Sequence, residues 1–277
     1  MVKYLAGLYN RDYFKLTKDE EVEKEVVTKR NSKKLGKLEV YNSSMNFEYP
    51  KAVRHYKSLF PNNYMDFLDL YEYEEMNTLN KLYLEEINKN TATELSIKSL
   101  IVENKLYHVI GSILKGGQFY FGHHNLYIFP EFQLGSLYRA DYLLVGLASG
   151  GYQFVFVEME HPNKNITLAD GNYGEAFRKG INQINDWKVW LDSNFSSLTD
   201  VFKKSTNKSL PEEFYKYDSS RFHFAVVAGR RKNFSERTYW LKRNEEKKTG
   251  IRIFHYDNLY DYSMDLITQK EHGYLSY

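Results

Sequence analysis

The chain has 277 residues, 42% of them hydrophobic, and a net charge of +2 from 38 Lys and Arg against 36 Asp and Glu. This length allows a full hydrophobic core in one large domain or two smaller ones, and the near-neutral charge leaves any attraction to nucleic acid to local basic patches. The absence of cysteine excludes a disulfide framework, a thiolate metal site and a cysteine nucleophile, and it fits a reducing compartment.

The N-terminal residues lack the long apolar segment of a signal peptide, and no stretch reaches the roughly 18 apolar residues of a membrane span. We therefore expect a soluble, cytoplasmic protein with no membrane contact. The 25 Tyr and 18 Phe are typical of half-buried strand and interface positions, although stacking platforms for bases are an alternative.

The first 85 or so residues differ in pattern from the rest of the chain. Residues 18–30 form a charge run that is typical of a solvated face. Residues 37–50 contain strand-like stretches around an Asn-Ser-Ser turn signal, and residues 52–90 have helical spacing that breaks at Pro61. We expect a small α+β module over residues 1–85, a boundary between about residues 80 and 92, and a second domain over 86–277.

The second domain begins with a predicted helix over residues 93–114, for which Thr91 or Thr93 is a candidate N-cap. Apolar runs at 119–132, 138–148 and 151–160 predict three strands, and residues 171–195 carry apolar side chains at close to helical period. A buried strand at 221–231 and a strand, turn and short helix at 251–266 close the chain. This order predicts an α/β fold with helices packed on a central mixed sheet.

The most informative segment is the pair of apolar runs on either side of Ser149-Gly150. These residues are a turn signal, so the pattern predicts a β-hairpin. A hairpin symmetric about the turn pairs Asp141 with Glu158, and Glu160 shares a strand face with Glu158. Three carboxylates would then converge at one end of the sheet. The alternative is a set of acids at a fraying, solvated hairpin end.

A carboxylate cluster of this kind predicts a divalent cation. Neighbouring carboxylates raise one another's pKa unless a cation lies between them, and hard oxygen ligands suit Mg²⁺ or Mn²⁺. Such a cation polarises a phosphoryl oxygen and lowers the pKa of its bound water. The predicted metal ligands are Asp141, Glu158 and Glu160, and the predicted chemistry is phosphodiester hydrolysis.

These residues resemble the PD-(D/E)XK nuclease superfamily, in which an acid on one strand is followed by (D/E)-x-K on the next. More closely, the chain is similar to the Shedu antiphage-defence nuclease domain over about residues 90–262. The matching stretches are PEFQLGSLYRADYLLVG, FVFVEMEHP, QINDWKVWL, AVVAGRR and IFHYDNLYD. The resemblance implies a restriction-endonuclease-like core, Mg²⁺ or Mn²⁺ as cofactor and DNA as partner.

The resemblance also carries individual roles onto this sequence. Asp141 matches the first acid and Glu158 the (D/E) of the motif. Glu94 resembles an auxiliary helix carboxylate, although an acid at a helix N-terminus is stabilised there by the dipole in any case. Gln183 resembles a helix glutamine that faces the site, with an exposed helix position as its alternative. Arg139 is a candidate phosphate contact or a partner in a salt bridge at the strand end.

Glu160 departs from the motif, because it stands where lysine is usual. A lysine would orient the attacking water and offset developing negative charge, and a glutamate cannot do the second. Glu160 could instead ligate a second cation or accept a proton from the water. Lys179, one helical turn before Gln183, is a candidate for a lysine that has moved to the helix.

Basic and histidine residues elsewhere are less specific signals. Arg230 and Arg231 follow a predicted strand and are candidate nucleic-acid contacts, with an ordinary charged loop as the alternative. His123, His124 and His161 have no further ligand at a recognised zinc spacing, so we expect solvated or hydrogen-bonded imidazoles.

Two classes of function fit these patterns. The first is a metal-dependent DNA endonuclease in antiphage defence, in which the N-terminal module senses a DNA feature, binds a partner or assists homo-oligomerisation. The second is a catalytically silent nucleic-acid-binding or assembly module that keeps the nuclease fold. An RNA-processing enzyme is a third and more distant reading, because the sequence does not separate DNA from RNA.

Overall fold

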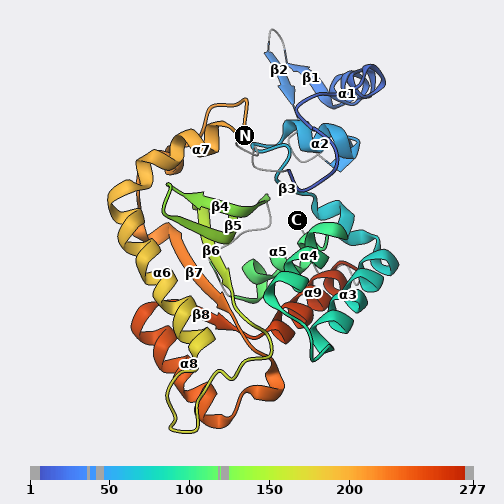
Figure 1. Cartoon of the computed structure of the whole chain (residues 1–277). Helices are drawn as coiled ribbons and strands as arrows, with labels where there is room; N and C mark the ends of the chain where they lie inside the picture. The colour runs from blue at the N-terminus through green and yellow to red at the C-terminus, as the bar shows by residue number, and fades with distance from the viewer. Residues whose placement is uncertain (1–6, 36–37, 42–46, 118, 120–124, 272–277) are drawn as a thin grey trace.

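The computed structural model describes residues 7–35, 38–41, 47–117, 119 and 125–271 (Figure 1). Its centre is a six-stranded sheet in the order β3-β4-β5-β6-β7-β8. Neighbouring strands are antiparallel from β3 to β6 and parallel from β6 to β8. The strands of this sheet are β3 (Tyr64–Met65), β4 (Leu126–Leu134), β5 (Tyr138–Ala148), β6 (Gly151–Met159), β7 (Phe222–Val227) and β8 (Ile251–Phe254). The predicted α/β fold with a central mixed sheet is confirmed.

Helices cover both faces of the sheet, and Figure 1 shows α6, α7 and α8 on the side opposite α3, α4, α5 and α9. The α-helices are α1 (Lys18–Asn31), α2 (Lys51–Lys57), α3 (Tyr73–Asn88), α4 (Glu94–Glu103), α5 (Tyr107–Gly116), α6 (Glu175–Asn194), α7 (Thr199–Lys203), α8 (Glu236–Thr249) and α9 (Tyr256–Glu271). The 3-10 helices are η2 (Phe67–Tyr71), η3 (Phe195–Leu198), η4 (Glu212–Phe214), η5 (Ser219–Arg221) and η6 (Arg231–Asn233). Among the described residues, no helix combines the length and apolar content that a bilayer crossing requires.

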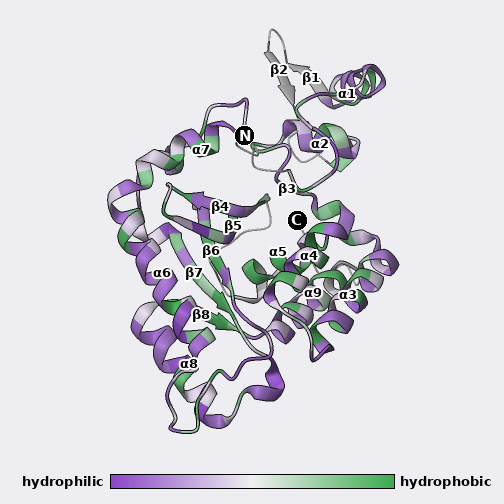
Figure 2. Ribbon diagram, viewed as in Figure 1, coloured by the Kyte–Doolittle hydropathy of each residue, from purple (hydrophilic) through white to green (hydrophobic). Residues whose placement is uncertain are grey.

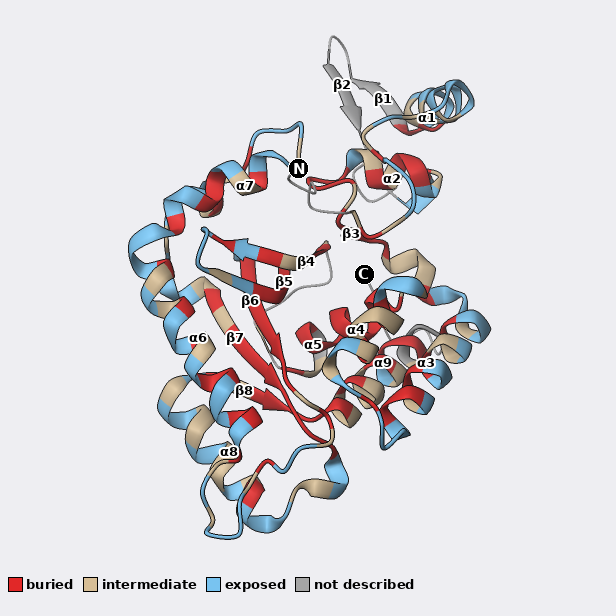
Figure 3. Ribbon diagram, in the orientation of Figure 1, coloured by how far each residue is buried: buried red, intermediate tan, exposed pale blue. Residues whose placement is uncertain are grey.

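Alternation along the central strands builds a separate core on each face. On β6, Phe154 and Phe156 join the core under α6, whereas Val155 and Val157 join the core under α5 and α9. Because both faces are covered, these strands read as continuous apolar runs rather than as alternating ones. Figure 3 shows the strands buried between the two helix layers.

The helices differ from the prediction in two places. The single helix expected over 93–114 is divided into α4 and α5, and Lys105 between them has a left-handed φ of 58°. Thr93 caps α4 as expected, since its hydroxyl accepts a hydrogen bond from the Ser96 N–H at 3.1 Å. Helix α8 has no counterpart in the prediction, because it is largely hydrophilic (Figure 2) and shows little apolar periodicity.

The N-terminal region is only partly separate from the rest. Strand β1 (Ser32–Leu35) pairs with β2 (Leu38–Tyr41), and a small cluster of Val27, Tyr49 and Val53 packs by itself. The expected turn at residues 42–44 lies outside the described residues. By contrast, Phe60 belongs to the core under α6, and Tyr83 to the core under α9. Packing therefore crosses the expected boundary at residues 80–92, and independent folding of residues 86–277 stays a prediction.

Phe60 offers a test of this continuity. Its ring is fully buried and contacts Phe129, Phe202 and Phe214. We expect Phe60→Ala to lower the free energy of unfolding of the whole sheet by about 3–5 kcal/mol in one cooperative urea transition. Leu82→Ala, on the exposed side of α3, is the control. A loss below about 1 kcal/mol, or a separate early transition, would show that residues 1–85 fold apart from the sheet.

Candidate functional site

The β5–β6 hairpin has the register that the sequence predicts. Ala148 pairs with Gly151 at the turn, and Tyr142 pairs with Val157 at the far end. Asp141 and Glu158 come next in the same register, beyond the last paired residues. The side chains of Asp141, Glu158 and Glu160 are all buried. The hairpin therefore delivers three carboxylates to one end of the central strands, at the point where the pairing between β5 and β6 stops.

Asp141 is held on both of its oxygens. Its Oδ2 accepts a hydrogen bond of 2.7 Å from the Met159 N–H, and its Oδ1 lies 2.6 Å from Lys98 Nζ. Burial raises the pKa of the Asp141 carboxyl, and the Lys98 charge and the Met159 N–H act in the opposite direction. Burial disfavours the charge of Lys98, but the charge and hydrogen bond of Asp141, together with Glu94 and Glu131, outweigh that cost and raise the pKa of the lysine.

Lys98 is a site residue that the sequence reasoning missed. Its Nζ also lies 3.1 Å from Glu94 Oε1 and 3.3 Å from Glu131 Oε1, so one ammonium serves three carboxylates. Glu94 was predicted as an auxiliary helix carboxylate, and the structure places it beside Asp141 through this lysine. The available signal was the four-residue spacing from Glu94 to Lys98 on α4, which is common on solvated helices.

Glu160 is held by a second lysine, from α6. Lys179 Nζ lies 3.0 Å from Glu160 Oε1, as the candidate role for Lys179 requires. Helix α6 comes this close because Gly180 has no side chain: a Cβ there would lie 3.2 Å from Glu160 Cγ and 3.0 Å from Val226 Cγ1. Tyr256 fixes the strand end by donating its hydroxyl to the Glu160 carbonyl at 2.6 Å.

Glu158 differs from both neighbours, because its Oε2 is buried and has no hydrogen-bond partner among the described residues. Burial, followed by the charges of Asp141 and Glu160, raises the pKa of Glu158 to about 9. At neutral pH this carboxyl therefore keeps a proton. An unpartnered buried carboxyl oxygen costs free energy unless something fills its place.

The net charge of the cluster decides whether it favours the binding of a cation. Five carboxylates (Asp141, Glu158, Glu160, Glu94 and Glu131) meet three cations (Lys98, Lys179 and Arg139). Fully ionised, the cluster would carry an excess of two negative charges. Hard carboxylate oxygens with such an excess fit Mg²⁺ or Mn²⁺. Within the described ranges, however, no three of these groups already stand in a metal-holding arrangement. The ligand chemistry fits, while two oxygens are presently engaged by lysines.

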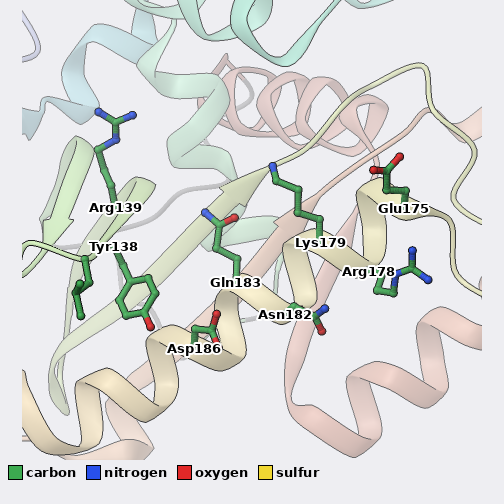
Figure 4. A pocket seen from close by; sticks show the side chains of 9 residues that line it. Tyr138, Arg139, Glu175, Arg178, Lys179, Asn182, Gln183 and Asp186 are labelled. Atoms are coloured by element: carbon green, nitrogen blue, oxygen red, sulfur yellow. The ribbon is translucent and has the colours of Figure 1, made fainter.

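A groove opens beside the cluster, between α6 and the β4–β5 turn (Figure 4). Its volume of about 690 Å³ lies within the range of small-molecule sites. Figure 4 shows Lys179 and Gln183 projecting from the same side of α6. The groove is lined by Leu137, Tyr138, Arg139, Glu175, Arg178, Lys179, Asn182, Gln183 and Asp186. Three of the predicted residues, Arg139, Lys179 and Gln183, therefore share one surface.

Arg230 and Arg231 lie elsewhere. Arg230 is buried, and its guanidinium donates to Asp257 and to Asn88 Oδ1. Arg231 is half exposed and pairs with Asp261. Neither lines the groove or pairs with the three hairpin carboxylates. The geometry gives Arg230 a structural contact between α3 and α9, whereas the sequence suggested a nucleic-acid contact or an ordinary charged loop.

Of the three histidines that the sequence singles out, His161 is the one within the described residues. His161 follows Glu160, and its Nδ1 accepts a hydrogen bond of 3.0 Å from the Asn163 N–H. This is the hydrogen-bonded imidazole that the sequence led us to expect at this position. His123 and His124 lie outside the described residues.

Comparison with known proteins places this geometry in a family. Residues 91–260 match the family model described as "Shedu protein SduA, C-terminal". The match spans more than half of the 277 residues and contains the hairpin, α4, α6 and the groove. Among curated proteins, none matches the chain.

The raised pKa of Glu158 predicts a dependence of stability on pH. The folded chain binds a proton at Glu158 up to about pH 9, whereas the unfolded chain releases it near pH 4.5. Between these values the unfolded state holds fewer protons, so this group makes stability fall as pH rises, by up to about 1.4 kcal/mol per unit. We expect Glu158→Gln to flatten this decline and to be more stable than the parent at pH 8.

The measurement is urea unfolding at pH 5.5, 7 and 8.5 in buffer with EDTA. The other carboxylates of the cluster are the same in both chains, so the difference between the curves reports the ionisation of Glu158 together with its effect on Asp141 and Glu160. Parallel stability curves for parent and variant would contradict the proton assigned to Glu158.

Proposed function

The chain belongs to the Shedu family through its residues 91–260, a membership that supports a role in antiphage defence, and on this premise we propose that it is a divalent-cation-dependent DNA endonuclease. The observation that carries the proposal is the buried carboxylate cluster at the end of the β5–β6 hairpin, with one Glu158 oxygen unpartnered. A structural cluster gains nothing from leaving that oxygen unsatisfied. A site that takes up a cation together with its substrate gains a free ligand oxygen from the same arrangement.

Asp141 and Glu158 would hold the cation, with Glu160 as a further oxygen ligand. When bound, Mg²⁺ or Mn²⁺ would neutralise charge on the scissile phosphate and lower the pKa of a coordinated water. The residues of the chain supply positioning around it. The Met159 N–H fixes Asp141 Oδ2, and Glu158 would have to lose its proton to serve as a ligand.

The groove supplies the nucleic-acid contacts in this proposal. Lys179 and Arg139 are half exposed and line it, so each can meet a phosphate that enters the groove. Gln183 adds a neutral hydrogen-bonding group on the same helix side as Lys179 (Figure 4). Phosphate contacts from Lys179 and Arg139 would position the nucleic acid in the groove without reading its base sequence.

A silent nucleic-acid-binding or assembly module is the second candidate, and one observation favours it. Lys98 and Lys179 compensate Asp141 and Glu160 through direct ion pairs of 2.6 and 3.0 Å. If these ion pairs are permanent, the cluster is a structural charge network, and the groove binds nucleic acid without cleaving it. Cleavage assays separate the two candidates.

We expect Asp141→Asn and Glu158→Gln each to lower cleavage of plasmid or linear DNA by at least about a hundredfold with Mg²⁺ or Mn²⁺. Both substitutions keep side-chain size and remove an ionic ligand, so nucleic-acid affinity in EDTA should stay near that of the parent. Asp200→Asn, an exposed acid on α7, is the matched control and should cleave normally. Parent-like cleavage by both site variants, or no cleavage of DNA or RNA by the parent with any divalent ion, would favour the silent module.

The contact between Lys179 and Glu160 predicts a charge-swap result. Glu160→Lys alone would place two ammonium groups where an ion pair of 3.0 Å now lies, so we expect it to lose activity although it restores the usual motif. The double variant Glu160→Lys with Lys179→Glu restores opposite charges and should recover part of the cleavage rate. Lys179→Met should lower the rate about tenfold or more. Full activity of Lys179→Met would remove this lysine from the site.

A further inference from the structure

Glu131 has an unusual backbone for its place in the fold. It lies inside β4, yet its φ is 51°, in the left-handed region that residues with a side chain disfavour. Its neighbours pair with β5, Pro130 with Tyr142 and Phe132 with Ala140, whereas Glu131 itself makes no ladder pair. Backbone strain of this kind persists only where the surrounding structure maintains it, and it gathers at functional sites.

The side chain of Glu131 shows what the strained backbone achieves. Its Oε1 lies 3.3 Å from Lys98 Nζ, and its Oε2 lies 2.8 Å from Arg139 Nε. One carboxylate thus holds two cations that face different parts of the site. Lys98 continues to Asp141 Oδ1 at 2.6 Å, and Arg139 lines the groove. Figure 4 shows Arg139 and Tyr138 leaving β5 in opposite directions, which separates the guanidinium from the α6 wall.

We propose that Glu131 is a positioning residue of this site, which sets Lys98 on Asp141 and Arg139 on the phosphates in the groove. The proposal rests on the nuclease function proposed above. It also gives a direction to the coupling: a phosphate that occupies Arg139 leaves Glu131 with Lys98 as its remaining cation. Released from Arg139, the Glu131 carboxylate can draw closer than 3.3 Å to Lys98 Nζ, which strengthens that ion pair and weakens the hold of Lys98 on Asp141. Nucleic-acid binding would thereby free an Asp141 oxygen for the divalent cation.

Double-mutant cycles on the full chain test this role. The single variants are Glu131→Gln, Arg139→Met and Lys98→Met. The two double variants combine Glu131→Gln with Arg139→Met and with Lys98→Met. The probes are an oligonucleotide duplex in EDTA for the Kd and the same duplex with Mn²⁺ for kcat and KM. Glu131→Gln should weaken the Kd and lower kcat, each by several-fold or more. Its effect on the Kd should vanish in the Arg139→Met background, and its effect on kcat should vanish in the Lys98→Met background.

Glu48→Gln is the matched control, because Glu48 has a similar exposure and pairs with Arg30 at 2.6 Å, outside the groove. Its effects should be small and should add to those of Arg139→Met and Lys98→Met. Glu131→Gly separates positioning from stability. It removes both ion pairs and also relieves the left-handed strain, so its melting temperature should equal or exceed that of the parent while its activity falls.

Parent-like activity of Glu131→Gly, or fully additive Glu131→Gln effects in both backgrounds, would overturn the role of Glu131 alone. A second outcome is that the parent chain fails to cleave while the Kd values still show coupling between Glu131 and Arg139. That result would overturn the proposed nuclease function and keep Glu131 as a residue that organises the binding groove. A parent that neither cleaves nor binds the duplex would overturn both proposals together.

Discussion

Compensation of buried negative charge is the constraint on which the rest of this site depends. The ends of two apolar strands bury three carboxyl groups, those of Asp141, Glu158 and Glu160. An isolated ionised carboxylate is strongly disfavoured in such a place, because it has lost its hydration. The chain meets this cost in three different ways. Asp141 is paired with Lys98, Glu160 is paired with Lys179, and Glu158 retains its proton. A cluster balanced in this way changes its charge and its partners together when a cation or a phosphate arrives.

The fold supplies the positions of the two lysines. Thr93 caps α4, which fixes the start of the helix that carries Lys98 into the cluster. Gly180 allows α6 to approach β6 and β7 closely enough for Lys179 to reach Glu160. Tyr256, at the start of α9, holds the Glu160 carbonyl. Helices on both faces of the sheet are therefore needed for one site, which explains why the two core layers and the carboxylates cannot be considered apart.

Sequence reasoning succeeded where a local pattern determines geometry. The Ser149-Gly150 turn sets the hairpin register, and that register alone places Asp141 next to Glu158 in the ladder order. It failed where the partner is distant in sequence. Lys98 is 43 residues before Asp141 and resembles any other charged residue of a helix. The strand pattern of β4 likewise gives no indication that Glu131 has a left-handed backbone conformation. The division into α4 and α5 was also missed, because the left-handed Lys105 interrupts a sequence pattern that is otherwise continuously helical.

A direct test of a cation site built from these carboxylates is calorimetric titration of the metal-free chain with Mn²⁺ near pH 7, in buffers of different ionisation enthalpy. Binding should release protons, because Glu158 keeps its proton to about pH 9 until it becomes a ligand. The binding heat should disappear in the Asp141→Asn chain. Absence of Mn²⁺ binding to the parent, or binding that Asp141→Asn leaves unchanged, would contradict a cation site at the end of the β5–β6 hairpin.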